Sequence, residues 1–285
     1  MIQALAHGAL LLGLVAATYQ DMKTREVPDW LNYSLIAGGL AAAVMLSIAE
    51  SSWLPLLISL IGLAVAIAIG YAMYYAGQWG GGDAKLFMGM GTVMGIAISG
   101  PIQTHVMLGF GVWWIITGSV YGLVWSVYLA TKNKKEFKKT YMESMRTPKV
   151  KRERRVIQII TAILLVITIL VPFEIRILTI SMALLVFGLY YLFAFVHTVE
   201  ATSMLKTVPV KKLTEGDWLV EPVLLKKKVL VKPSRTGLTL EELSILQKKA
   251  GNQKARIRQG IPFVPVFLIA YILIMLAGSP LAFLL

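Results

Sequence analysis

Apolar residues dominate the chain in long runs, which are separated by short or strongly basic polar segments. The runs are roughly 17–25 residues long, the length that an α-helix needs to cross about 30 Å of hydrocarbon. We therefore predict an all-α integral membrane protein, a polytopic bundle of six to eight transmembrane helices. The candidate spans are residues 2–20, 30–48, 53–78, 84–100, 105–130, 156–171, 177–197 and 261–283. Residues 156–197 form either two spans or one span with a re-entrant piece.

The long polar stretch 198–260 predicts a small cytoplasmic α+β module with little core of its own. Two short β-like runs, Trp218–Leu225 and Lys228–Lys232, precede a helix start at Thr239, where Glu242 completes a capping-box pattern. The predicted organisation is a catalytic transmembrane core over 1–130, a basic cytoplasmic loop over 131–155, further transmembrane helices over 156–197, the module over 198–260 and a last transmembrane helix over 261–285.

The charged residues predict the orientation of the chain in the membrane. The connections 49–52, 101–104 and 172–176 together hold one cation, whereas 131–155 holds eleven and 198–260 holds thirteen. Cations accumulate in cytoplasmic loops, so the N-terminus is expected outside and the basic segments inside. An even number of spans also places the C-terminus outside. Residues 1–10 contain no Lys or Arg, so we expect the first span to be a permanent helix rather than a cleaved secretory signal.

The composition of the chain argues against nucleic-acid binding and against a metal site. The chain has 285 residues, is 57% hydrophobic and has a net charge of +13. Because the cations follow the predicted topology, they indicate attraction to anionic inner-leaflet lipid rather than binding of nucleic acid. The chain has no cysteine, and His7, His105 and His197 are scattered, so we predict no zinc site, no metal and no cofactor.

Two acids, Asp21 and Asp83, lie at the ends of apolar spans, while most other acids lie in polar loops. A charge at membrane depth costs at least about 2.5–3.5 kcal/mol, so such acids need an explanation. Under the predicted topology both acids lie at the cytoplasmic face, on separate helices. Taken alone, Asp21 also fits an ordinary interfacial residue, and the glycines before Asp83 also fit a turn.

Paired carboxylates suit hydrolysis of a peptide bond. If two carboxyl groups approach closely, one stays ionised and acts as a general base on water, while the other keeps a proton. The protonated group hydrogen-bonds to the scissile carbonyl and later supplies a proton to the leaving amine. This chemistry needs neither a metal nor a cysteine.

Glycines surround the second acid. Gly80, Gly81 and Gly82 remove side chains beside Asp83 and are expected to let a substrate strand approach the backbone. The pairs Gly77/Gly81 and Gly91/Gly95 have the spacing that lets membrane helices pack tightly. The aromatic residues Tyr19, Trp30, Trp53 and Trp79 at span ends are interpreted as interfacial anchors.

These motifs resemble the GxGD aspartyl proteases of the membrane, and within them the type IV prepilin peptidase and archaeal preflagellin peptidase group. Gly80-Gly81-Gly82-Asp83, followed by Ala84-Lys85, matches the signature of the family. Asp21, with Lys23, Arg25 and Val27-Pro28 after it, is similar to the family's first catalytic segment. The resemblance is strong over about residues 10–100 and looser afterwards. It implies that Asp21 and Asp83 are the catalytic pair.

The resemblance also implies the substrate, a pilin- or flagellin-like precursor with a short basic leader ahead of an apolar helix. Glu26 and Asp29 flank the first acid and are candidate contacts for a basic leader, although Lys23, Arg25 and Lys85 lie near and oppose this role. Bacterial prepilin peptidases typically carry a Cys-containing zinc segment and an N-methyltransferase activity. This chain has no cysteine, so we predict peptidase activity only.

Two other function classes stay open on the sequence. In a cation- or proton-coupled transporter, the same acids would bind the ion or relay protons, although transporter sites usually lie near mid-membrane. The third class is a non-catalytic partner in the assembly of a pilus or archaellum.

Overall fold

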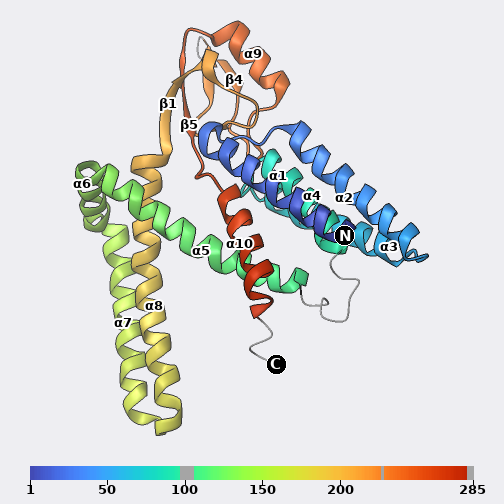
Figure 1. Cartoon of the computed structure of the whole chain (residues 1–285). Helices are drawn as coiled ribbons and strands as arrows, with labels where there is room; N and C mark the ends of the chain where they lie inside the picture. The colour runs from blue at the N-terminus through green and yellow to red at the C-terminus, as the bar shows by residue number, and fades with distance from the viewer. Residues whose placement is uncertain (97–105, 226–227, 281–285) are drawn as a thin grey trace. The chain divides into compact units, whose positions relative to one another are not determined.

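The structure, a computed structural model, describes residues 1–96, 106–225 and 228–280 (Figure 1). His105 and the connection 101–104 lie outside the described residues. The α-helices are α1 (Ile2–Thr24), α2 (Asp29–Ala49), α3 (Leu54–Tyr75), α4 (Gly81–Ile96), α5 (Val106–Lys132), α6 (Lys134–Arg146), α7 (Pro148–Leu170), α8 (Phe173–Val199), α9 (Leu240–Ala250) and α10 (Val264–Ala277). The strands are β1 (Leu205–Pro209), β2 (Trp218–Leu219), β3 (Val223–Leu225), β4 (Lys228–Val231) and β5 (Lys254–Arg258).

The helices confirm an all-α polytopic membrane protein. Among the described residues, five helical segments are long and apolar enough to cross a membrane, and they lie in α1, α2, α3, α5 and the segment Phe173–Met204. The helix α10 is apolar but shorter, α4 has 16 residues, and α7 begins with a strongly basic turn. Each of the eight candidate spans therefore overlaps a helix, but three of these helices are shorter or more polar than a typical span.

The chain divides into two compact units, one of Met1–Leu123 and Thr207–Leu285, the other of Val124–Lys206. The segment that the sequence analysis treats as a basic loop is mostly helical, because it forms α6 and the start of α7. Its Lys, Arg and Glu residues are good helix formers. The Thr147 side chain also accepts a hydrogen bond from the amide of Val150 and thereby caps α7.

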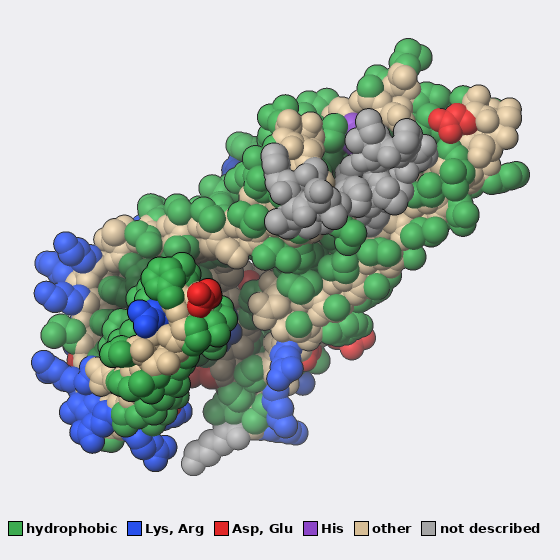
Figure 2. Space-filling model, turned by 90° about the horizontal axis from the view of Figure 1, so that it is seen from below, with side chains coloured by type: hydrophobic (Ala, Val, Ile, Leu, Met, Phe, Trp, Pro, Cys, Tyr) green, Lys and Arg blue, Asp and Glu red, His purple; other side chains and the backbone are tan. Residues whose placement is uncertain are grey.

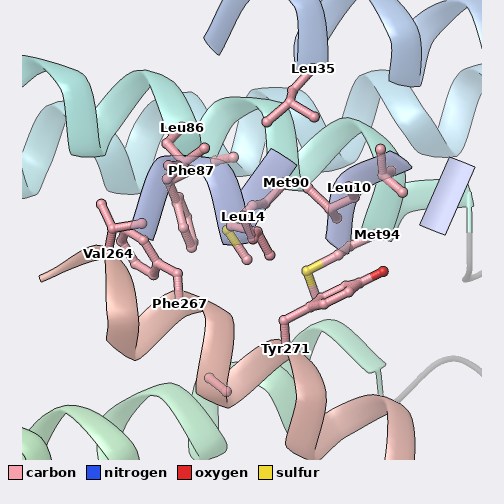
Figure 3. Close-up of a cluster of buried hydrophobic side chains, with 14 of the residues drawn as sticks. Leu10, Leu14, Leu35, Leu86, Phe87, Met90, Met94, Val264, Phe267 and Tyr271 are labelled. Carbon is pink, nitrogen blue, oxygen red and sulfur yellow. The ribbon is translucent and has the colours of Figure 1, made fainter. Parts of the chain in front are cut away.

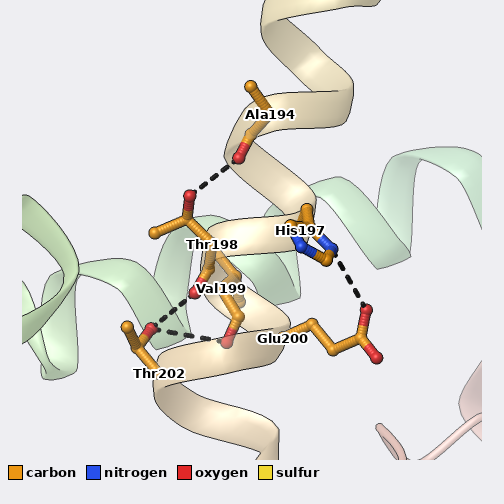
Figure 4. Close-up of polar contacts among 6 residues, drawn as sticks. All are labelled: Ala194, His197, Thr198, Val199, Glu200 and Thr202. Atoms are coloured by element: carbon orange, nitrogen blue, oxygen red, sulfur yellow. Dashed lines mark hydrogen bonds and ion pairs between the residues drawn. The ribbon is translucent and has the colours of Figure 1, made fainter. Parts of the chain in front are cut away.

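In the second unit α7 and α8 form a helical hairpin (Figure 1). The hydroxyls of Thr168 and Thr179 hydrogen-bond across the two helices at 2.9 Å. At the other end, α8 continues into a π-helical turn, Glu200–Met204. Figure 4 shows threonine hydroxyls on this end bonding to carbonyls one turn earlier, and the contact of His197 with Glu200 at 4.0 Å.

In the first unit α1, α2, α3 and α4 run alongside one another (Figure 1). A buried apolar cluster joins α1, α2, α4 and α10, and Figure 3 shows its side chains converging between these helices. Its labelled members are Leu10, Leu14, Leu35, Leu86, Phe87, Met90, Met94, Val264, Phe267 and Tyr271. The outer faces of the helices remain apolar, and Figure 2 shows hydrophobic side chains over much of the visible surface. This is the surface that lipid covers in a membrane protein.

Glycines bring the helices of this unit close together, as predicted for Gly91 and Gly95. A Cβ on Gly91 would lie 2.5 Å from the Ala66 Cβ, and one on Gly95 would lie 2.6 Å from the Ile58 carbonyl oxygen. The prediction is wrong for Gly77, which has a φ of 69° and ends α3 in a turn rather than packing two helices.

The polar module folds around its own core, contrary to the expectation that it has little core. Strands β1, β5 and β2 form one sheet, and β3 and β4 form a separate hairpin. The predicted capping box of Thr239 and Glu242 starts α9. Ten buried side chains fill the space between these elements: Val210, Leu213, Leu219, Val223, Val231, Leu238, Leu246, Ala250, Ala255 and Ile257. Strand β5 was not predicted, although its Lys and Arg residues alternate with the buried Ala255 and Ile257 as in a half-buried strand.

Candidate active site

Asp83 lies in the first turn of α4, where its carboxylate accepts a hydrogen bond from the Gly80 amide at 3.1 Å. A carboxylate is favoured there because the amides of the first helical turn lack partners within the helix. The side chain of Asp83 is partly exposed. The glycines therefore form the turn that begins α4 and presents this acid.

The three glycines before Asp83 have different surroundings. A Cβ on Gly82 would lie 3.1 Å from the Val27 carbonyl oxygen, so this glycine lets α4 pack against the segment that links α1 and α2. Around Gly80 and Gly81 a Cβ would meet no atom closer than 3.6 Å. Approach of a substrate backbone stays a prediction, and Gly80 and Gly81 offer more room for it than Gly82.

Asn32 on α2 supports the same turn, and the sequence analysis did not identify it. Its side chain is fully buried, and its Nδ2 donates to the Gly82 carbonyl oxygen at 3.3 Å. Its Oδ1 has no hydrogen-bond partner among the described residues. The sequence signal was weak, since Asn32 is one of several polar residues within the apolar run of α2.

Asp21 lies in the last turn of α1 and is only 5% exposed. Its Oδ2 accepts a hydrogen bond from the Val264 amide at the start of α10, at 3.0 Å. The Phe263 amide also faces this carboxylate. The negatively charged group is therefore stabilised by the N-terminus of the last helix, a contact across most of the chain length.

Arg25 ends α1 with a φ of 64° in the left-handed region, and its amide bonds to the Asp21 carbonyl oxygen at 2.9 Å. Its guanidinium donates to the Gly260 carbonyl oxygen at 2.7 Å. The positive charge of Arg25 also acts on the Asp21 carboxylate. Arg25 thus connects the end of α1 to the chain segment that precedes α10.

Asp21 and Asp83, on α1 and α4, lie near enough for the charge of Asp21 to act on Asp83. No group of three or more His, Asp or Glu side chains suited to a metal ion occurs in the part of the chain that the structure describes. Two neighbouring carboxyl groups in a poorly solvated place are suited to sharing a proton and to activating water.

A buried aromatic cluster lies beside the site, and it shows that the interpretation of Trp79 as an interfacial anchor is wrong. Trp79, expected to be an interfacial anchor, is only 2% exposed. Its ring packs against Phe87, Trp114 and Phe267, with centroids 5.2–5.4 Å apart. In contrast, Tyr19, Trp30 and Trp53 are exposed. The cluster fixes the turn before Gly80, because Trp79 precedes it directly.

Of the two candidate leader contacts, Glu26 lies between α1 and α2 and Asp29 begins α2, and both are exposed. The Asp29 carboxylate is already paired with the Lys85 ammonium at 2.7 Å. Lys85 therefore links the starts of α2 and α4. Contact of Glu26 or Asp29 with a leader stays a prediction.

Comparison with known proteins identifies the part of the chain that holds this site. Residues 8–127 match the type IV leader peptidase family. This segment is similar to that family. It includes Asp21, Asn32 and Asp83, but not α10.

Similar proteins are named preflagellin peptidases. One from Methanococcus voltae is 29% identical over 136 residues, which are 45% of this chain and 58% of the relative. One from Methanocaldococcus jannaschii is 35% identical over 83 residues, which are 29% of this chain and 35% of the relative. The chain thus aligns with between about a third and three fifths of the length of these relatives. No solved structure matches the chain.

Proposed function

We propose that the protein is a membrane aspartic endopeptidase that removes the short basic leader of prepilin- or preflagellin-like precursors at the cytoplasmic face. The observation that supports this most is that Asp21 and Asp83, from two separate helices, lie near enough for the charge of Asp21 to act on Asp83. The family of residues 8–127 and the names of the relatives support the same substrate class.

In the proposed reaction one carboxylate takes a proton from water, and the water oxygen attacks the scissile carbonyl carbon. The other carboxyl group donates a hydrogen bond to the carbonyl oxygen, which carries the developing negative charge. The C–N bond then breaks, the leaving nitrogen receives a proton, and one water is consumed. Because the two groups interact, the general acid and base roles belong to the pair rather than to one residue.

The substrate side of the proposal follows from charge. A leader rich in Lys and Arg is attracted to acids near the site, and Glu26 and Asp29 are the proposed contacts. Anionic lipid is the proposed partner of the basic helices, since α6 has five cations and no buried residue. We expect peptidase activity without methyltransferase activity.

A cleavage assay tests this function. The purified protein is mixed with prepilin and preflagellin precursors, beside the Asp21→Asn and Asp83→Asn variants, and the new N-terminus of the product is sequenced. We expect a cut between leader and apolar helix that both substitutions abolish. No cut of several precursors, or a cut that survives either substitution, would favour a transporter or a non-catalytic assembly partner.

A further inference from the structure

We infer that the first turn of α10 is a positioning element of the active site, in which the Val264 amide orients the Asp21 carboxylate. This inference rests on the proposed function for its kinetic consequence, but the contact itself is testable without activity. Val264 lies outside the segment that matches the leader peptidase family. The inference therefore assigns a role to a part of the chain that the family resemblance does not reach.

The geometry of the contact has three parts. The Val264 amide donates to the Asp21 Oδ2 at 3.0 Å, and the Asp21 side chain is 5% exposed. Val264 itself is fully buried in the core that joins α1, α4 and α10 (Figure 3). A hydrogen bond to an ionised group in such a place is roughly twice as strong as a neutral one. The tightly packed Val264 therefore holds the Asp21 carboxylate in one orientation.

A second contact fixes the same junction. Arg25 donates to the Gly260 carbonyl oxygen at 2.7 Å, four residues after Asp21 and four residues before Val264. Pro262 lies between Gly260 and Val264, and Pro265 lies in the first turn of α10. Proline fixes φ near −65°, so this segment has little freedom to shift. The end of α1 is therefore held at two points by one stiff segment.

Helix electrostatics explains why Asp21 needs this partner. A carboxylate in the last turn of α1 faces the negative end of its own helix dipole, which disfavours its charge. The first turn of α10 offers the opposite sign and amides that lack partners within the helix. Without α10, an ionised Asp21 would be unstable in this orientation. The contact holds the carboxylate in place for attack on the substrate by water.

The cleanest test replaces one amide by an ester. The α-hydroxy analogue of valine at position 264 keeps the side chain and removes only the N–H group. The matched control is the same replacement at Val266, which is equally buried and whose amide bonds to the Phe263 carbonyl oxygen rather than to Asp21. Each replacement removes the hydrogen bond of one amide in the first turn of α10. A difference in activity between the two esters therefore reports on the positioning of Asp21 rather than on the stability of α10.

For cleavage of a precursor, we expect the ester at 264 to lower kcat by about 10- to 100-fold and to change KM by less than about twofold. The ester at 266 should leave both constants near the values of the unmodified protein. Arg25→Ala should also lower kcat, and Arg25→Lys should restore part of it, because an ammonium group can still donate to Gly260. Equal kinetics for the two esters would overturn the inference.

A second measurement does not depend on activity. Exchange of the Val264 amide hydrogen is followed by NMR in protein labelled with nitrogen-15 valine, with Val266 as internal reference. We expect Asp21→Ala to speed exchange at Val264 by about tenfold or more, and Asp83→Ala to leave it unchanged. Unchanged exchange in Asp21→Ala would overturn the inference even if the protein cleaves precursors. Faster exchange in a protein that cleaves no precursor would instead overturn the proposed function alone.

Discussion

At the scale of single residues, two acids that look alike in sequence have different surroundings. Asp83 bonds to an amide of its own turn, whereas Asp21 bonds to an amide of the last helix. Both are thus placed against the positive end of a helix, which stabilises an ionised carboxylate. The sequence identified both acids through their place at span ends. Their partners are backbone amides, which every residue possesses, so no residue pattern reveals them.

The first prediction concerns recognition of the leader. Glu26 is exposed, whereas the charge of Asp29 is already offset by Lys85 at 2.7 Å. We therefore expect Glu26→Lys to raise KM for a basic-leader precursor by about two- to fivefold, the range of an exposed ion pair. Asp29→Lys should have a smaller effect. A precursor with a neutral leader should be cleaved as before by both variants.

The control is Glu50→Lys, which makes the same charge change at the other end of α2. Steady-state cleavage of the two precursors is measured for each variant. If Glu26→Lys alters the basic-leader and neutral-leader precursors equally, Glu26 does not contact the leader.

At the scale of elements, the sequence predicted the apolar helices and the start of α9 well, because span length and capping are local properties. It did not predict that Trp79 is buried, since a tryptophan at a span end is typical of an anchor and only the fold brings Phe267 beside it. It also treated α6 as a loop, because a basic amphipathic helix has no apolar run. The first failure concerns a contact with a distant part of the chain, whereas the second concerns a local helical pattern without an apolar run.

The second prediction concerns the contact between α2 and α4. Gly38 and Gly39 are neighbours in α2, but a Cβ on Gly39 would collide with the Thr92 side chain, while one on Gly38 would meet nothing within 4 Å. Thr92 is fully buried and cannot yield freely. We expect Gly39→Ala to destabilise the protein by about 1–3 kcal/mol.

Gly38→Ala is the matched variant. It should be neutral or stabilising by up to about 1 kcal/mol, because alanine favours a helix over glycine. Thermal unfolding in one detergent compares the two variants with the parent protein. Equal melting temperatures for Gly38→Ala and Gly39→Ala would contradict close packing of α2 against α4.

At the scale of the whole molecule, every candidate site residue lies in the unit formed by Met1–Leu123 and Thr207–Leu285. The second unit, Val124–Lys206, contributes none of them. The first unit is made of two segments that are far apart in sequence. The hydrogen bonds of Asp21 with Val264 and of Arg25 with Gly260 connect these two segments. If the Val264 amide positions Asp21 as inferred, the proposed chemistry requires the C-terminal part of the chain, which lies beyond the residues 8–127 that match the family.

The third prediction concerns orientation in the membrane. The distribution of cations predicts that the N-terminus is outside and residues 198–260 are inside, and therefore that Asp21 and Asp83 lie at the cytoplasmic face. Because the chain has no cysteine, a single introduced cysteine can be labelled without background from native thiols, and its labelling reports on topology. We expect a membrane-impermeant maleimide to label Ser51→Cys in intact cells, and to label Ser244→Cys only after the membrane is opened. Both serines are exposed, the first between α2 and α3 and the second on α9.

The unsubstituted protein serves as the unlabelled control. The reverse pattern would place both acids at the outer face, where precursors with cytoplasmic leaders do not reach them, and the proposed function would then be untenable.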